Sequence, residues 1–340
     1  MKKRCLCLVL VCLLLVGCTA PGTTQQKKYT ATFLTLFDTV TSVVGYAESE
    51  EAFAEKAQIV HDELQIYHQL FDIYNTYDGI VNLKVVNENA GTQAVQVDPI
   101  VLELLKSCKE YYLLTGGKVN AAMGSVLQLW HEARTDAYNN PANTYLPDQS
   151  KLEEAAKHMD LNDVILDEEN CTVQFADPAL RLDVGAIAKG WATQRVAEVA
   201  PEGLLISVGG NVCATGPKSL DGSAWVVGIQ DPDGGDYLHT VYVSEGSVVT
   251  SGDYQRRYPV DGKFYHHIID PATLYPSEYF RSVTILCDDS GLADALSTAL
   301  FLLPLEEGMA LVQQCGAKAM WVHMDGSMSY SPGFQDVIRT

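Results

Sequence analysis

A carboxylate and two hydroxyl groups fall close together in a strongly apolar segment near the C-terminus. Within residues 293–301, Asp294 and Thr298 are four residues apart, and Ser297 precedes Thr298. This spacing places Asp294 and Thr298 on one face of a helix, and the apolar neighbours predict that the helix is buried. A buried carboxylate needs a cation or several donors, and Mg²⁺ takes such oxygens together with waters and substrate phosphates. A structural alternative also fits: Asp294 is a helix-start acid near Ser290, and Thr298 bonds back to the helix.

A second candidate site lies at residues 181–192, where apolar residues alternate around Asp183 before Gly185. We expect a strand that Gly185 ends, followed by a helix over residues 186–199 with Lys189 in its first turn. Backbone N–H groups at a helix start favour anions such as phosphate, and Lys189 adds a positive charge. The alternative is a plain strand–helix junction whose glycines only allow close packing.

Two adjacent histidines are the third candidate. His266 and His267 follow Tyr265 in a strand-like run, so alternation directs their rings to opposite faces and only one can face a site. A purely structural strand histidine is the alternative. Residues 250–253, Thr-Ser-Gly-Asp, predict a small polar turn with Arg256 nearby, or else a plain surface loop.

The elements that must position these residues mix strands and helices in no fixed order. Strand-like runs occupy residues 33–46 (interrupted at 37–39), 164–166, 172–175, 204–208, 225–230, 240–243, 282–286 and 319–323. Helical patterns occupy residues 50–70, 98–115, 150–158, 292–303 and 305–315. Because neither a strict strand–helix repeat nor an internal period appears, we predict an α+β fold: mixed, largely antiparallel sheets with packed helices.

The N-terminus has the composition of an export signal. Basic residues at 2–4, an apolar run over 6–16 and the ending Leu-Val-Gly-Cys18 resemble a lipoprotein signal peptide over residues 1–18. Cleavage before Cys18 and lipidation of its thiol would anchor the protein to the outer face of the bacterial cytoplasmic membrane, or the periplasmic side. An uncleaved anchor is the alternative, although the apolar run is short for a spanning helix. Residues 19–30 predict a flexible tether, and residues 31–340 the functional domain.

Charge and cysteine usage exclude some classes of protein. The net charge is −20, and no basic stripe is present to contact nucleic acid. The five cysteines beyond Cys18 are scattered without CxxC spacing, which favours buried thiols over a disulfide framework or a zinc site.

Five motifs together carry a family resemblance. They are Leu-Asp-Val-Gly-Ala-Ile-Ala-Lys-Gly at 182–190, Val-Gly-Gly-Asn at 208–211, Thr-Ser-Gly-Asp-Tyr at 250–254, His-His-Ile-Ile-Asp-Pro at 266–271 and Ala-Asp-Ala-Leu-Ser-Thr at 293–298. In this order they resemble the ApbE-type FAD:protein FMN transferases, over about residues 33–330. The resemblance implies an ApbE/T-fold-like architecture, often in exported lipoproteins. It also implies an enzyme that splits Mg²⁺-bound FAD, passes the FMN phosphoryl group to a Thr or Ser hydroxyl of an exported acceptor protein, and releases AMP.

The same resemblance implies roles for particular residues. His267 would be the catalytic base. The FAD contacts would be Phe37, Tyr74, Val119, Asn120, Asp183, Lys189 and Ile268. The Mg²⁺ site would comprise the Ala186 carbonyl, Asp294, Ser297 and Thr298.

Some positions depart from the family pattern, and two rival functions remain open. Leu274 stands where Gly is usual, Asn120 where Asp is common, Ala122 where Thr is common, and Ala186 where a second Gly often follows Gly185. The rivals are a Mg²⁺-dependent FAD pyrophosphatase that gives FMN and AMP, and a non-catalytic flavin-binding lipoprotein. Their products separate them: flavinylated protein, free FMN, or neither.

Overall fold

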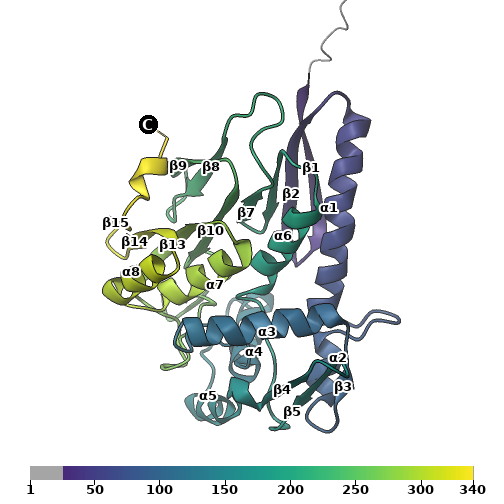
Figure 1. Ribbon diagram of the computed structural model, residues 1–340. Coiled ribbons are helices and arrows are strands. Elements are labelled where there is room, and N and C mark those ends of the chain that lie inside the picture. The colour runs from purple at the N-terminus through teal and green to yellow at the C-terminus, as the bar shows by residue number, and fades with distance from the viewer. Residues whose placement is uncertain (1–25, 340) are drawn as a thin grey trace, which may run out of the picture.

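The computed structural model describes residues 26–339 (Figure 1). The predicted signal peptide, Cys18 and most of the predicted tether lie outside the described residues. Strand β1 begins at Lys27, so the prediction that the tether continues to residue 30 is wrong at its C-terminal end. Among residues 26–339, every helix is too short or too polar to cross a bilayer.

An open, eight-stranded sheet organises the molecule, with β1 and β15 at its edges and every neighbouring pair antiparallel. In spatial order its strands are β1 (Lys27–Leu36), β2 (Thr39–Ala47), β6 (Leu204–Val208), β7 (Asn211–Ala214), β10 (Gly246–Gly252), β13 (Phe280–Cys287), β14 (Lys318–His323) and β15 (Met328–Tyr330). Strand β2 therefore pairs with β6, from which a long stretch of chain separates it.

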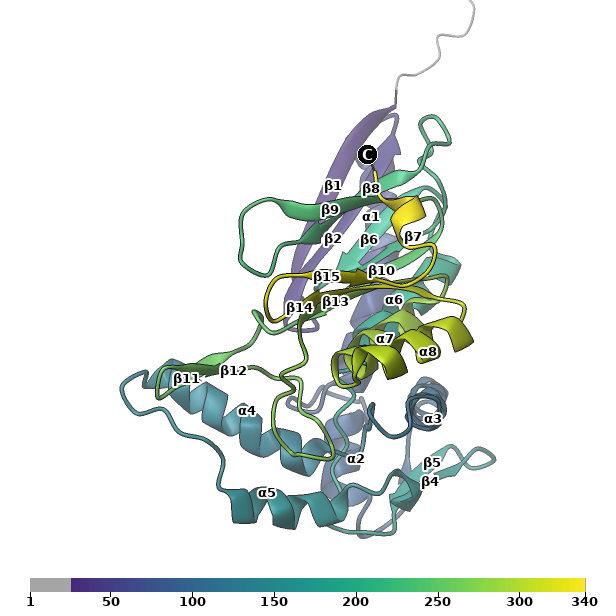
Figure 2. The same ribbon diagram turned by 90° about the vertical axis from the view of Figure 1, so that its left-hand side faces the viewer.

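Both faces of this sheet are covered, because successive side chains of a strand point to opposite faces. In β10, Val248 packs into the core on one face, whereas Val249 packs into the core on the other. In β14, Met320 and Trp321 likewise pack into the cores on opposite faces of the sheet. Figure 2 shows helices α7 (Ser290–Phe301) and α8 (Leu305–Gln314) on one side of the sheet and the hairpin of β8 (Trp225–Gln230) and β9 (Tyr237–Val243) on the other.

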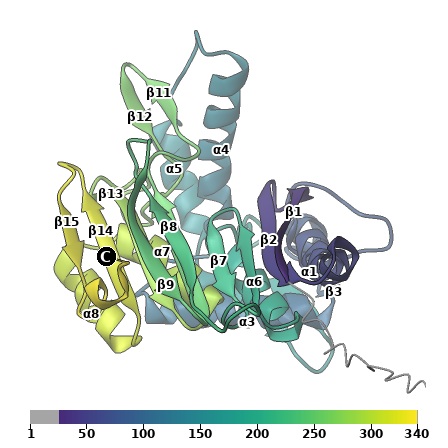
Figure 3. The same ribbon diagram turned by 90° about the horizontal axis from the view of Figure 1, so that it is seen from above.

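The helices begin where local capping predicts. Helix α1 has Ser49 as its N-cap, whose side chain accepts from Ala52 N, and it buries one apolar face. Seen from above, α1 lies beside β1 and β2 (Figure 3). Helix α3 begins at Pro99 after the N-cap Asp98. The helices are α1 (Glu50–Phe71), α2 (Leu83–Asn89), α3 (Pro99–Leu114), α4 (Gly124–Asn139), α5 (Gln149–Ala155), α6 (Ala188–Val199), α7 (Ser290–Phe301) and α8 (Leu305–Gln314).

Helices α2 to α5 form a second layer below the main sheet (Figures 1 and 2). They lie with a small antiparallel sheet of β3 (Val95–Gln96), β5 (Thr172–Phe175) and β4 (Val164–Asp167). The hairpin of β11 (Tyr258–Val260) and β12 (Lys263–Tyr265) packs against α4. Short helical turns are η1 (Ala156–His158), η2 (Leu161–Asp163) and η3 (Gln335–Val337). The predicted α+β class with largely antiparallel sheets is confirmed.

Candidate active site

A cavity of about 640 Å³ collects nearly all of the predicted site residues. Its walls come from the β1–β2 turn, the end of α1 and the loop after it, the loop before α4 and one face of α4, the loop before α6, the β6–β7 turn, the end of β10 and the loop after it, the loop after β12 and helix α7. The predicted residues that line it are Phe37, Tyr74, Val119, Asn120, Asp183, Ala186, Lys189, His267, Ile268, Asp294 and Thr298. Ser297 does not line the cavity, and Cys18 lies outside the described residues.

The carboxylate of Asp294 is held where the starts of α6 and α7 meet. Its Oδ2 accepts the backbone N–H of Gly190 at 2.8 Å and lies 3.6 Å from the Lys189 ammonium. A Cβ at Gly190 would collide with the Ser290 carbonyl and the Asp294 side chain, so only glycine permits this approach. The sequence predicts that backbone N–H groups at this helix start bind an anion. One of these groups, the Gly190 N–H, is instead bonded to Asp294.

The hydroxyl groups near Asp294 have separate roles. Ser297 is fully buried and donates its hydroxyl hydrogen to the Asp294 carbonyl at 2.8 Å. Since that hydrogen is used, the 2.8 Å contact between Ser297 and Ser251 requires Ser251 to donate. Thr298 lines the cavity. Ser297 does not, and its contact with Ser251 joins α7 to β10 instead. The prediction of Ser297 as a metal ligand is therefore not supported by its position.

The segment before α6 is not the strand that alternation predicts. Within the described residues its backbone bonds to side chains and turns rather than to a neighbouring strand: Leu182 exchanges two hydrogen bonds with the Asn87 side chain, at 2.9 and 2.7 Å. The Asp183 N–H is donated to the Ala121 carbonyl at 2.8 Å. Regular helix begins only at Ala188, two residues later than predicted. The extended turn that results carries the Ala186 backbone to the cavity wall.

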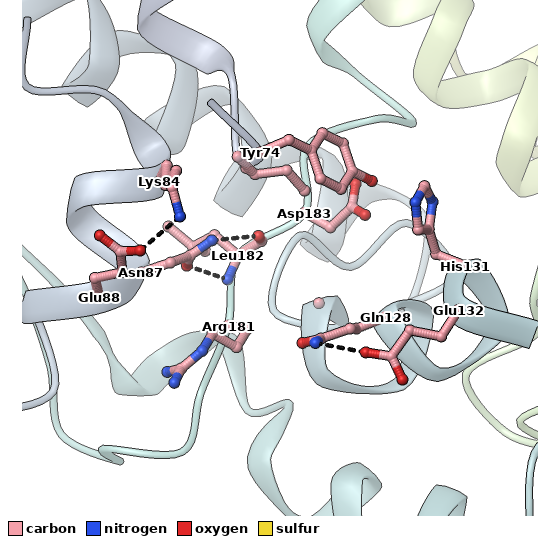
Figure 4. Close-up of a pocket in the computed structure, with 12 residues that line it drawn as sticks. Tyr74, Lys84, Asn87, Glu88, Gln128, His131, Glu132, Arg181, Leu182 and Asp183 are labelled. Carbon is pink, nitrogen blue, oxygen red and sulfur yellow. Dashed lines mark hydrogen bonds and ion pairs between the residues drawn. The ribbon is translucent and has the colours of Figure 1, made fainter. Parts of the chain in front are cut away.

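The carboxyl group of Asp183 is poorly accessible to water. Its carboxylate accepts the Gly185 N–H at 2.8 Å, yet burial outweighs that bond and raises the pKa of the carboxyl above its usual value. Beside it, partial burial and the charge of Asp183 raise the pKa of Tyr74 to about 12. Figure 4 shows Tyr74, Asp183 and His131 gathered at the edge of an adjoining pocket of about 400 Å³, and the Tyr74 and His131 rings stack at 5.1 Å.

The two histidines point in different directions, but not because of strand alternation, since β12 ends at Tyr265 before both. His266 Nδ1 accepts from Ile268 N at 3.2 Å, so its Nε2 carries the hydrogen and donates to the Ser277 carbonyl at 2.8 Å. His266 thus fastens the loop. His267 lines the cavity, and its buried Nδ1 has no hydrogen-bond partner within residues 26–339.

His267 is neutral in the free protein. Burial first, and then the positive charge of Arg256, lower the pKa of its imidazole well below the usual 6.5, with further contributions from His266, Arg134 and Lys189. An anion bound among these cations would raise that pKa again.

The β1–β2 turn presents Phe37 to the cavity in an unusual backbone conformation. Phe37 and Asp38 have φ values of 53° and 49°, in the left-handed region that non-glycine residues seldom adopt. The Phe37 N–H is donated to Nδ1 of His68 at 3.1 Å, and the two rings meet edge to face at 5.6 Å. His68, a residue of α1, thereby stabilises the β1–β2 turn, whose backbone conformation is unfavourable on its own.

A directional chain of hydrogen bonds continues from His68. Because Nδ1 accepts, Nε2 carries the hydrogen and donates to the Tyr77 oxygen at 3.2 Å, and Tyr77 donates to Asp72 at 2.7 Å. Asp72 also accepts from Tyr74 N at 2.6 Å and Asn75 N at 3.0 Å. Burial alone would raise the pKa of Asp72, but these bonds lower it. The chain fixes Phe37 and Tyr74 relative to each other. His68 and Asp72 could not be identified from the sequence, because only the fold brings them near Phe37.

Asn120 shapes the cavity through its backbone turn. Its side-chain amide donates to the Met159 carbonyl at 2.9 Å and accepts from Ala122 N at 2.9 Å, so both ends are occupied. Val119 is almost fully buried beside it. Next to this turn, Lys118 binds both carboxylate oxygens of Asp270 at 3.0 Å, which ties the turn to the loop that carries His267.

The donor set suits a hard cation that arrives with its substrate. Asp294, Thr298 and the Ala186 backbone line one cavity. No group of three or more His, Cys, Asp or Glu side chains within residues 26–339 is arranged to hold a metal on its own. Mg²⁺ commonly binds one or two carboxylates and completes its octahedron with substrate phosphates and water, so these residues fit it.

Comparison with known proteins defines the class to which this fold and cavity belong. The ApbE protein from Thermotoga maritima has a solved structure that superposes with a TM-score of 0.82 at 30% identity, covering 92% of this chain and 100% of that one. The flavin transferase ApbE from Vibrio cholerae superposes with a TM-score of 0.75 at 20% identity, over 92% and 99%, which shows a shared fold.

The sequence comparisons give the family. The sequence model of the ApbE family matches residues 37–321, so this chain belongs to the ApbE family. A protein of Treponema pallidum named FAD:protein FMN transferase is 35% identical over 277 residues, covering 76% of this chain and 75% of that protein. One of the same name from Klebsiella pneumoniae is 33% identical over 236 residues, covering 67% and 70%. The resemblance found in the motifs is confirmed.

Proposed function

We propose that this protein is an FAD:protein FMN transferase that uses Mg²⁺ to move FMN from FAD to a Thr or Ser hydroxyl of an acceptor protein, releasing AMP. The observation that carries this proposal is the convergence of Asp294, Thr298, Lys189 and His267 on one cavity, in a chain of the ApbE family. The relatives named for this activity each match about two thirds or more of the chain.

The cavity has one wall suited to the flavin and another suited to phosphate. Phe37 and Tyr74 offer aromatic rings for the isoalloxazine, held by the bonds that run through His68 and Asp72. Lys189 and the guanidinium groups of the cavity give positive charge to a protein whose net charge of −20 repels a dinucleotide elsewhere.

Phosphoryl transfer depends mainly on positioning and charge stabilisation. Mg²⁺, held by Asp294, Thr298 and the Ala186 carbonyl, would neutralise pyrophosphate oxygens when bound. The acceptor hydroxyl oxygen forms a bond to the FMN phosphorus, and the bond from that phosphorus to the AMP phosphate oxygen breaks. His267 takes the hydroxyl proton, and AMP leaves with the electrons of the broken bond.

The test is the product distribution. The purified full chain is incubated with FAD, Mg²⁺ and a candidate exported protein, and mass spectrometry follows the acceptor while chromatography follows the nucleotides. Transferase activity predicts an acceptor that gains FMN together with one equivalent of AMP. Free FMN and AMP with an unmodified acceptor would indicate a pyrophosphatase, and unchanged FAD would indicate a binding protein.

We also propose that the protein is an exported lipoprotein, on the basis of the signal-like residues 1–17 and Cys18. Lipidation at Cys18 would anchor the chain to the outer face of the cytoplasmic membrane or the periplasmic side. Its acceptor would then be another exported protein within reach of that surface.

A further inference from the structure

Two arginines line the cavity without forming an ion pair to a carboxylate of the described residues. Arg134 comes from α4, and Arg256 from the loop between β10 and β11. Across residues 26–339, neither guanidinium lies within 4.0 Å of an acidic side chain. The two cavity lysines differ, since Lys118 is paired with Asp270 at 3.0 Å and Lys189 lies 3.6 Å from Asp294.

Arg134 is fixed by its own helix. Its guanidinium donates to Nδ1 of His131, one turn earlier, at 3.0 Å. The His131 ring in turn stacks on Tyr74, whose position beside Asp183 is visible in Figure 4. Burial lowers the pKa of the Arg134 guanidinium, which nevertheless stays charged at neutral pH. A charged group held in place and left without a counter-ion is unfavourable unless a ligand supplies one.

Arg256 lines the cavity from a loop with an unusual backbone conformation. Its φ of 44° lies in the left-handed region, which a residue with a side chain seldom adopts. The next residue, Arg257, faces away: its guanidinium lies 4.4 Å over the Phe264 ring, and its carbonyl accepts from the Tyr138 hydroxyl at 3.2 Å. The turn thus separates two adjacent arginines, one in the cavity and one on the β11–β12 hairpin.

We infer that Arg134 and Arg256 form an anion-binding wall that grips the phosphoryl group being transferred, with Arg256 contacting its oxygens as the bond to AMP breaks. This inference rests on the proposed function for the identity of the ligand, a nucleotide pyrophosphate. Guanidinium suits this role, because its planar donors match two phosphate oxygens at once. Arg256 and His267 line the same cavity.

The first measurement compares two probes that differ only by a phosphate. Affinities for FMN and riboflavin are measured by flavin fluorescence without added divalent cation, for wild type, Arg256→Gln, Arg134→Gln and Arg257→Gln. We expect Arg256→Gln and Arg134→Gln to weaken FMN about tenfold or more, the size of a lost charge-assisted bond, and to leave riboflavin unchanged. Arg257→Gln is the matched control, with the same charge lost outside the cavity, and should change neither.

The second measurement is single-turnover transfer at saturating FAD and Mg²⁺. Arg256→Gln should slow transfer by about a hundredfold, as for loss of one donor to a transition-state oxygen, and Arg256→Lys should restore part of that loss. Equal weakening of FMN and riboflavin, or an effect of Arg257→Gln matching that of Arg256→Gln, would overturn the inference. If Arg256→Gln fails to fold, the affinities of Arg134→Gln for FMN and riboflavin test the inference instead.

The outcomes also separate this inference from the proposed function. Wild-type protein that discriminates FMN from riboflavin through these arginines, yet transfers nothing, would leave the anion wall standing and refute the transferase. Wild-type protein that transfers FMN while both glutamine variants behave normally would refute the anion-binding wall and support the transferase.

Discussion

Substitution of His68 tests whether one acceptor atom, His68 Nδ1, holds the turn that presents Phe37 to the cavity. His68 Nδ1 receives the Phe37 N–H at 3.1 Å in a turn where Phe37 and Asp38 both have left-handed backbones. His68→Leu removes that acceptor, whereas His68→Asn places an amide oxygen close to where Nδ1 lies. We therefore expect the leucine variant to lose the turn and the asparagine variant to keep it.

The magnitude follows from one hydrogen bond and its consequence for the turn. A net intramolecular bond contributes about 0.5–1.5 kcal/mol, and 1.4 kcal/mol is a factor of ten in an equilibrium. If the turn that presents Phe37 becomes tenfold less populated, the apparent dissociation constant for flavin rises by the same factor. His68→Leu should thus weaken riboflavin and FAD equally, by up to about tenfold, because the change is remote from phosphate.

The assay is flavin fluorescence titration with riboflavin and FAD, alongside thermal unfolding to exclude global loss of structure. His68→Asn should bind both flavins within about twofold of wild type, since the lost Tyr77 contact is the lesser one. Equal weakening by the leucine and asparagine variants would refute the role of Nδ1. Wild-type affinity in His68→Leu would refute the dependence of the turn on this bond.

The remaining predictions concern metal, proton transfer, packing and anchoring. Asp294→Ala should abolish Mg²⁺-dependent turnover in a folded protein, and surviving Mg²⁺ dependence measured by steady-state kinetics would contradict the metal assignment. His267→Ala should slow FMN transfer about a hundred- to ten-thousand-fold with little change in FAD affinity, while His266→Ala should do far less, as single-turnover rates will show. Because the buried imidazole of His267 has a pKa lowered well below 6.5, the unfolded chain binds a proton that the native state does not, so stability should fall as pH drops below about 6.5, less steeply in His267→Ala by denaturant titration. Gly190→Ala should lower stability by about 1–3 kcal/mol, read as a lower melting temperature, because the added methyl group collides with α7. Cys18→Ala should release the protein from the membrane fraction, and an N-terminal peptide that never carries lipid mass in the wild type would contradict lipidation.

Local signals predicted every helix except α2 and α4 to within a few residues. Helix α1 and helix α3 follow their apolar spacing and caps, and β4 and β5 form over the predicted strand-like runs 164–166 and 172–175. Each of these depends on interactions between residues near in sequence, which is why composition and spacing suffice. The prediction that the tether extends to residue 30 was wrong because a polar edge strand such as β1 resembles a linker in composition.

Long-range contacts explain the other differences. Leu182 and Val184 alternate like strand residues, but the Asn87 side chain takes the backbone groups of Leu182, and no pattern within the segment could reveal that partner. Leu274 stands at a position with a φ of 62°, which explains the glycine usual there; here the cost is offset by burial of the side chain and a 2.9 Å bond from Trp130 to its carbonyl. The family motifs identified most of the cavity, whereas His68 and Arg134 belong to it only through tertiary structure.

The pairing of β2 with β6 has a consequence for when the cavity comes into existence. Strand β2 ends at Ala47 and β6 begins at Leu204, so the pairing closes a long loop before the sheet can grow toward β10 and β13. Closing long loops is entropically costly and slow, so folding is governed by non-local contacts. The walls that carry Phe37 and Asp294 meet only when nearly the whole chain has been made and collapsed. A chain truncated before α7 therefore lacks the part of the cavity wall that Asp294 and Thr298 form.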